Sequence, residues 1–160
     1  MTSHPLDNPV WASLATHHVA LAAAADGAAR YEADVAPFVG VAAADARATA
    51  AVETLVAPGE LAIFVGTAPP LSDAWRAEHD GPIAQMIRRA RLDVPDGPAT
   101  IELTGEKHVA DMLALTALVY PHYFRPRTIA MGRYIGIYDG DRLAAMAGER
   151  MHLEGHREIS

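Results

Sequence analysis

Apolar residues in the first 66 positions are spaced as in two helices and several short strands. The first helix is predicted to begin at Asn8, an N-cap followed by proline, and to end at the Asp26-Gly27 turn signal. The stretch RYEADVAPFVGVA, which Pro37 and the glycines interrupt, predicts one or two short strands. The residues that recur at helical spacing in the first helix are Val10, Leu14, His17 and Leu21.

A second helix and a buried strand follow in the pattern. DARATAAVETLVA predicts a helix that stops at Pro58-Gly59. ELAIFVG is continuously apolar after its first residue and predicts a fully buried strand. The proline-rich segment from Thr67 to Gly97 contains one short helical pattern, IAQMIRRAR. This segment is the best candidate boundary, and it predicts an N-terminal α/β half (1–96) and a C-terminal half (97–160).

The C-terminal half is predicted to hold strands around one long helix. ATIELT reads as a strand, and Thr104 as the cap of a helix that Pro121 ends. YIGIYDGDRLAAMAGERM predicts a hairpin turning at Asp139-Gly140, and HREIS begins another strand. Together the elements predict an α+β fold with a mixed, mostly antiparallel sheet flanked by helices. The predicted faces are Val109, Met112, Leu113, Ala117 and Tyr120 on the helix, Ile135 and Ile137 on one hairpin strand, and Leu143, Ala145 and Ala147 on the other.

Composition narrows the class of protein. Of 160 residues, 51% are hydrophobic and 21% charged, as in ordinary globular domains. The net charge of −7 and the lack of a basic run argue against a nucleic-acid partner. With no cysteine, disulfides and thiolate chemistry are excluded. The first residues do not read as a signal peptide and no segment reads as a membrane span, so we expect a cytoplasmic protein without a membrane partner.

Several clusters have both a functional and a structural interpretation. His152 and His156 could be metal ligands, but Gly155 between them favours a polar hairpin turn, and no metal is expected. The adjacent His17 and His18 point about 100° apart on a helix and cannot share one ion, which favours a solvated or core-edge pair. In the loop YPHYFRPRT, Arg125 and Arg127 could meet an anionic ligand, although solvated surface is the commoner outcome.

Two glycines and one carboxylate stand out in the predicted strands. Gly136 and Gly148 indicate a bulge, a crossing side chain or, less commonly, the close approach of a ligand. Glu158, beside Ile159, is either exposed at an edge or placed for proton chemistry in a cleft. No G-x-S-x-G, P-loop or G-x-G-x-x-G motif is present, so hydrolase, nucleotide triphosphatase and dinucleotide functions have no positive support.

The order ALVYPHYFRPRT, GRYIGIYDGDRLAAMAGERM, HREIS resembles the first half of the catalytic domain of the GNAT family of N-acetyltransferases, especially their FR47-like branch. The resemblance covers about residues 100–160, and 1–96 would be a variable N-terminal half. It implies transfer of an acetyl group from acetyl-CoA to an amine of a small molecule or amino-acid-like acceptor. By this resemblance, His156 and Glu158 lie on the acceptor side as candidate bases, and Ser160 begins to approach the pantetheine arm of the cofactor.

The family's strand continues into a loop of the form [RQ]-x-x-G-x-[GA], whose backbone N–H groups cradle the CoA pyrophosphate. No such loop follows HREIS in this sequence. The expectation is therefore an N-terminal part of an acetyltransferase, inactive alone and prone to self-association or to pairing with the missing half. Two alternatives stay open: a non-catalytic α+β domain that pairs with a partner chain, and a small-molecule binding module using Arg125 and Arg127.

Overall fold

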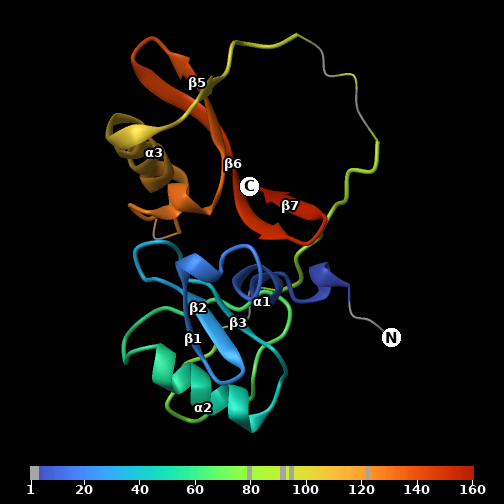
Figure 1. The fold of residues 1–160 in the computed structure, drawn as a ribbon. Coiled ribbons are helices and arrows are strands. Elements are labelled where there is room, and N and C mark those ends of the chain that lie inside the picture. Colours follow the sequence, from blue (N-terminus) through green and yellow to red (C-terminus); the bar gives the residue numbers. More distant parts are fainter. Residues whose placement is uncertain (1–3, 79–80, 91–92, 94–95, 122) are drawn as a thin grey trace.

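The computed structural model describes residues 1–160 except 1–3, 79–80, 91–92, 94–95 and 122. Two antiparallel sheets, one from each half of the chain, lie in the lower and upper parts of Figure 1. The predicted α+β class, with mostly antiparallel pairing and flanking helices, is confirmed. No helix in the described ranges is long and apolar enough to cross a membrane.

The first sheet has the order β1-β2-β3, and α1 and α2 pack against it. The strand β2 is buried along its whole length because it lies between the other two. Gly40 in β3 permits the close approach of α1, since a Cβ there would lie 2.5 Å from the Trp11 backbone nitrogen. The elements are η1 Pro5–Asp7, α1 Pro9–Leu14, η2 Val19–Leu21, β1 Ala22–Ala25, β2 Ala28–Tyr31, β3 Val39–Val41 and α2 Ala46–Leu55.

The second sheet has the order β4-β5-β6-β7, and α3 packs against β6. Its longest strand, β6, reaches from the β5–β6 turn down to the first sheet, where its end contacts α1 (Figure 1). The elements are β4 Ile101–Glu102, α3 Gly105–Val119, η3 Thr128–Met131, β5 Tyr134–Asp139, β6 Arg142–Leu153 and β7 His156–Ile159. The predicted strands and long helix of this half are therefore confirmed.

The first predicted helix is wrong beyond Leu14. The alanine run after it forms strand β1, which pairs with β2 across the turn at Asp26-Gly27. Gly27 has φ +84°, the left-handed conformation that a tight hairpin requires. Alanine favours helices, but pairing with the buried strand β2 overrides that local preference.

Two other predicted elements do not form. ELAIFVG is only partly buried, and Ile63 makes a single parallel bridge to Phe38. The described residues of IAQMIRRAR (83–90) are not helical and are almost all exposed, because no apolar face of theirs packs on the rest of the chain. The helix predicted from DARATAAVETLVA is confirmed. The stretch RYEADVAPFVGVA (30–42), predicted to hold one or two short strands, contains β3 and the last two residues of β2.

The predicted hairpin is present, with one change of face. Gly140, at φ +59°, and Asp141 form its loop, because Asp139 pairs with Arg142. An irregularity follows, in which Ala144 is the extra residue. Leu143 therefore faces the core, while the predicted companions Ala145 and Ala147 share the other face with Ile135 and Ile137.

On α3, only Met112 of the predicted apolar face is buried. The predicted face consists of Val109, Met112, Leu113, Ala117 and Tyr120.

One hydrophobic cluster joins the two halves. Val10 and Leu14 of α1 and Tyr31 of β2 pack with Met151 and Leu153 from the end of β6. All five residues are at most 1% exposed. Burial of each such side chain contributes about 1.5–3 kcal/mol relative to leaving it in water. The end of β6 is therefore fixed to the N-terminal half by core packing, whereas the division at residue 96 stays a prediction.

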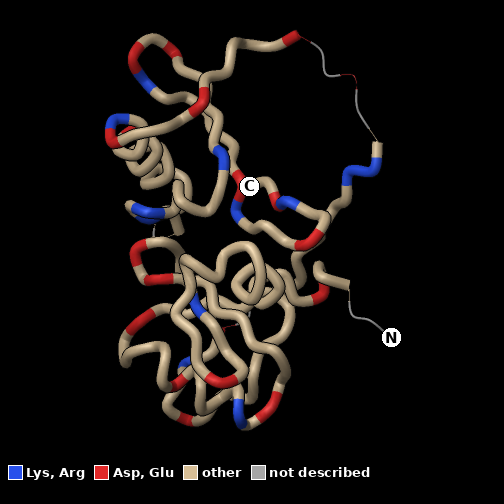
Figure 2. Tube along the Cα trace, viewed as in Figure 1, with Lys and Arg blue, Asp and Glu red and all other residues tan. Residues whose placement is uncertain are grey.

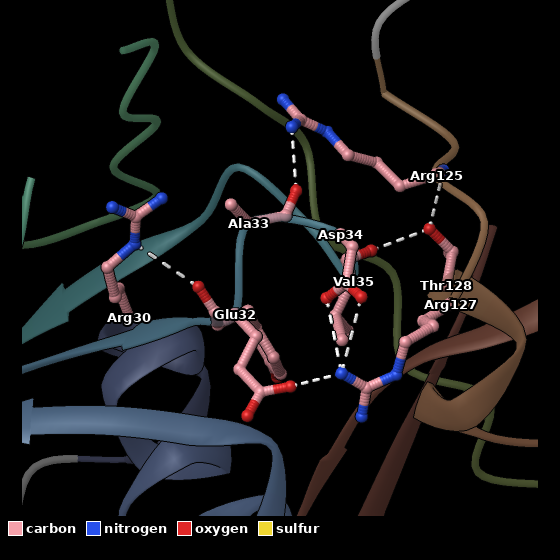
Figure 3. A network of polar contacts seen from close by, with 9 residues as sticks. Arg30, Glu32, Ala33, Asp34, Val35, Arg125, Arg127 and Thr128 are labelled. Carbon is pink, nitrogen blue, oxygen red and sulfur yellow. Dashed lines mark hydrogen bonds and ion pairs between the residues drawn. The ribbon is translucent and has the colours of Figure 1, made fainter. Parts of the chain in front are cut away.

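A polar network adds to this contact (Figure 3). Thr128 donates its buried hydroxyl to the Val35 carbonyl at 2.6 Å and accepts from the Arg125 backbone N–H at 2.7 Å. Arg127 pairs with Glu32 and Asp34, and Arg125 donates to the Ala33 carbonyl at 2.7 Å. The two arginines considered for an anionic ligand are thus occupied by the N-terminal half.

Candidate functional site

The three predicted site residues lie at the end of the described sheet, on or next to β7. Its residues pair with β6, so that His156 lies opposite Leu153 and Glu158 opposite Met151. His156 and Glu158 are both partly buried, while Arg157 and Ile159 between and after them are exposed. The alternation predicted for this strand is therefore present, and the turn predicted between the strands lies at Glu154-Gly155.

Glu158 is held by Arg150 of β6. The Arg150 Nε–H donates to Glu158 Oε2 at 3.1 Å, and the second guanidinium nitrogen pairs with Oε1. Arg150 also lies over the Phe38 ring, with Cζ 5.6 Å from the ring centroid. The pair is about 70% buried, with side-chain exposures of 29% and 27%. The Arg150 guanidinium that holds the carboxylate thus lies against Phe38 of the N-terminal half.

His156 has a different environment. Its ring meets His4 edge to face at 5.3 Å between centroids, and its Nδ1 lies 3.1 Å from the Glu154 carbonyl oxygen. The structure thus places the two candidate bases on one strand but with separate partners. Glu158 pairs with Arg150, and His156 contacts the hairpin turn at Glu154 and the His4 ring near the start of the chain.

Ser160 extends the pairing of β7. Its backbone N–H and carbonyl both bond to Gly148, at 2.9 and 3.0 Å. In antiparallel pairs these doubly bonded residues alternate with residues whose backbone groups point away from the partner strand. The N–H and carbonyl of Ile159 therefore point to the outer edge of β7. Sequence reasoning missed this donor, although the alternation along HREIS could have indicated it.

Gly148 is glycine because an aromatic ring crosses the strand there. A Cβ at this position would overlap the Tyr134 ring, the residue opposite on β5. Likewise a Cβ on Gly136 would lie 2.7 Å from a Leu143 methyl carbon. The crossing-side-chain interpretation is confirmed for both glycines. Burial raises the pKa of Tyr134 to about 12, so its hydroxyl stays protonated at neutral pH.

A second polar cluster lies inside the shared core. His18 is 6% exposed, and its Nδ1 is 2.8 Å from the Tyr31 hydroxyl and 3.1 Å from Ser13 Oγ. Burial, followed by the nearby His152, lowers the pKa of His18. His17 stacks on His152 with ring centroids 3.7 Å apart. The adjacent histidines thus point to different surroundings, His18 into the core and His17 outward.

Charged residues of both signs are spread over both halves, and Lys and Arg are interspersed with Asp and Glu along the described trace in Figure 2. Among the described residues, no group of three or more His, Asp or Glu side chains is arranged to hold a metal ion. The sequence offers no cysteine for such a group.

Known proteins resemble this chain in structure. A crystal structure of a protein from Novosphingobium aromaticivorans DSM 12444, assigned to the GNAT family of acetyltransferases, aligns with a TM-score of 0.67 and 28% sequence identity. The alignment covers 99% of this chain and 70% of that protein, so part of the latter has no counterpart in residues 1–160. No protein-family model and no curated protein matches the sequence. The fold is thus GNAT-like, and the similarity supports a general acetyltransferase function.

Proposed function

We propose that the chain is part of an acetyl-CoA-dependent N-acetyltransferase of GNAT type, acting on a small-molecule or amino-acid-like amine. The structural similarity over 99% of the chain, at 28% identity, carries this proposal. The resemblance of HREIS and the preceding hairpin to the family's strands supports it independently of residues 1–96. The FR47-like branch, a cytoplasmic location and the absence of nucleic-acid and membrane partners stay predictions.

In this proposal Glu158 is the base that accepts a proton from the acceptor ammonium. Its carboxylate lies on the β7 face that turns to the N-terminal half, so that half would form part of the acceptor site. The acceptor ammonium takes the place of one of the two Arg150 contacts and gives a proton to Glu158. The protonated carboxyl is neutral, so its pairing with Arg150 weakens until the proton is released. His156 is the second candidate, and a water molecule could carry the proton in either case.

Acetyl-CoA would supply an activated thioester to the amine nitrogen. The carbon–nitrogen bond would form as the carbon–sulfur bond breaks, and CoA would leave as a thiolate that takes up a proton from the acceptor nitrogen or from water. A backbone N–H is the usual donor for the oxyanion that develops in such a reaction. The open N–H of Ile159 fits this role and also suits the amides of the pantetheine arm. Ser160 can contribute only its hydroxyl, because Gly148 occupies its backbone groups.

Residues 1–160 fit the phosphates of acetyl-CoA less well than its thioester and pantetheine arm. Arg125 and Arg127 are occupied by Ala33, Glu32 and Asp34, and no phosphate-binding glycine loop is present. We therefore expect residues 1–160 alone to bind acetyl-CoA with a Kd of about 1 mM or weaker. Titration calorimetry measures this directly, and micromolar binding would contradict the expectation.

The function is tested by acetyl transfer from acetyl-CoA to a panel of small amines, in protein carrying residues 1–160 and any chain that its gene encodes after them. Glu158→Gln is expected to lower kcat/KM by about ten- to a thousandfold, as in the loss of a general base. Glu154→Gln is the matched control, because this exposed carboxylate lies in the turn before β7. Equal pH–rate profiles for wild type and Glu158→Gln would assign the base elsewhere.

One observation favours the alternative of an interaction domain. β7 is at the edge of the described sheet, and Ile159 on it is 63% exposed, as is common where a further strand or partner is added. In that case the chain would associate with itself or with a partner chain. Light scattering across a concentration series tests it, since a monomer at every concentration with no amine acetylation would argue against both functions.

A further inference from the structure

A pocket lies between α3 and the start of β6, away from β7. Its volume is about 360 Å³, which is within the usual range for small-molecule sites. Apolar groups of Leu115 and Leu118 on α3 and of Leu143 on β6 form its walls. Leu118 is 82% exposed, so it forms the open rim of the pocket, and a bound ligand would cover part of its side chain.

The polar groups of the pocket carry both signs of charge. Asp111 comes from α3, and Asp141 and Arg142 come from the β5–β6 turn. Within the described part of the chain, Arg142 and Asp141 have no hydrogen bond or ion pair with another side chain. Arg142 is thus a guanidinium beside an apolar wall that has no protein partner there, unlike Arg127 and Arg150.

Asp111 is fixed in place. Tyr138 donates its hydroxyl to Asp111 Oδ2 at 2.6 Å, and Lys107 donates to the same oxygen at 3.2 Å. The hydrogen bond from Tyr138 is the main reason that the pKa of Asp111 is lowered, so the group is an anion at neutral pH. Both contacts are on Oδ2, so Oδ1 is the oxygen left for a ligand among the described residues.

We propose that this pocket binds a small apolar zwitterion of the free amino-acid type. Arg142 takes the carboxylate, Asp111 takes the ammonium, and Leu115, Leu118 and Leu143 hold the apolar side chain. A guanidinium fits a carboxylate with two parallel hydrogen bonds, while a carboxylate oxygen suits an ammonium. A purely apolar ligand would leave both charges unused, and a simple anion would lie beside two carboxylates.

The binding test uses ligands that lack one feature at a time. L-Leucine is the probe, and 3-methylbutylamine lacks its carboxylate, 4-methylpentanoate lacks its ammonium, and glycine lacks its side chain. Backbone NMR shifts of the wild-type chain are followed in each titration. We expect saturable shifts at α3 and the β5–β6 turn with L-leucine, and binding weaker by about tenfold or more with each of the others.

Two pairs of variants then assign the contacts. Arg142→Gln should weaken L-leucine binding about tenfold, while Arg133→Gln, at another exposed arginine just before β5 and outside the pocket, should leave it unchanged. Leu118→Ala should weaken binding several-fold, and its neighbour Val119→Ala, which does not line the pocket, should not. All four positions are exposed, so each variant is expected to fold.

The proposal is overturned if L-leucine gives no saturable shifts at about 10 mM, a weak-binding limit. It is also overturned if the Arg142 and Arg133 variants bind alike, or if all ligands of the panel bind equally. These measurements need no acetyl donor, so their outcome is separate from that of the acetylation assay.

Discussion

The two ends of β6 have opposite environments. Its end, at Met151 and Leu153, lies fully buried against α1 and β2 of the N-terminal half. Its start packs beside α3, a helix of 15 residues of which only Met112 is buried, and a pocket remains there. The comparison indicates that β6 contributes more to stability at the end where the halves meet than at its start beside α3. Space for a ligand exists where a helix covers the strand only in part.

The largest loss of stability is expected when the packing between the end of β6 and the N-terminal half is disrupted. Leu153→Ala should lower the free energy of unfolding by about 2–5 kcal/mol, because it leaves a cavity in the shared core. Leu118→Ala is the same substitution on α3, beside the start of β6. It should lower the free energy of unfolding by about 0.5 kcal/mol or less. Urea denaturation of both variants measures the difference, and similar costs would contradict the comparison.

A second substitution adds a side-chain carbon within β6, between its two ends. Gly148→Ala places a Cβ against the Tyr134 ring and should destabilise the fold by about 1–3 kcal/mol. Gly97→Ala is the control, because no atom lies within 4 Å of the added Cβ and its φ is outside the left-handed region. Thermal unfolding of the pair tests this expectation. An unchanged midpoint for Gly148→Ala would show that the ring moves aside without cost.

The core shared by the two halves, which contains the buried His18, should also become less stable at acidic pH. The pKa of His18 is lowered from 6.5, since burial and the neighbouring His152 disfavour its charged form, and His17 opposes protonation too, while Glu149 favours it. A histidine with a lowered pKa in the fold stabilises it fully above pH 6.5. That stability is lost as the pH falls below 6.5 towards the folded-state pKa, by at most about 1.4 kcal/mol per pH unit.

His18→Gln, which cannot titrate, should reduce this pH dependence while keeping a polar group near Tyr31 and Ser13. The measurement is the free energy of unfolding at several pH values between about 5 and 8, where a histidine titrates. Equal slopes for wild type and variant would place the acid sensitivity in other groups, such as His152, whose pKa is also lowered by burial.

The smallest effect is expected at the rim of the contact between the halves. Arg127→Gln removes the ion pairs to Glu32 and Asp34, which are about half exposed. Such pairs contribute roughly 0–1 kcal/mol and are screened by salt. We therefore expect a small loss of stability at low ionic strength that disappears at high salt. A salt-independent loss above that range would mean that the pair carries more of the contact than its exposure implies.

The sequence determined the elements whose signals are local. Asp45 caps α2, the proline and glycine at 58–59 follow its end, and glycine at the β5–β6 turn fixes that hairpin. Alternation along HREIS gave the shared face of His156 and Glu158. These features depend on backbone conformation and on neighbours within a few residues, which a pattern of residues records directly.

Tertiary structure decided the features that depend on distant partners. The run Ala22–Ala25 is a strand because β2 needs a neighbour, against the helical preference of alanine. Arg125 and Arg127 are occupied because residues 32–34 lie beside them, more than 90 positions earlier in the chain. The burial of Leu153 and the exposure of Leu118 likewise follow from which surfaces meet. A leucine at helical or strand spacing is the same letter in both places, so only the folded contacts separate a core residue from the wall of a pocket.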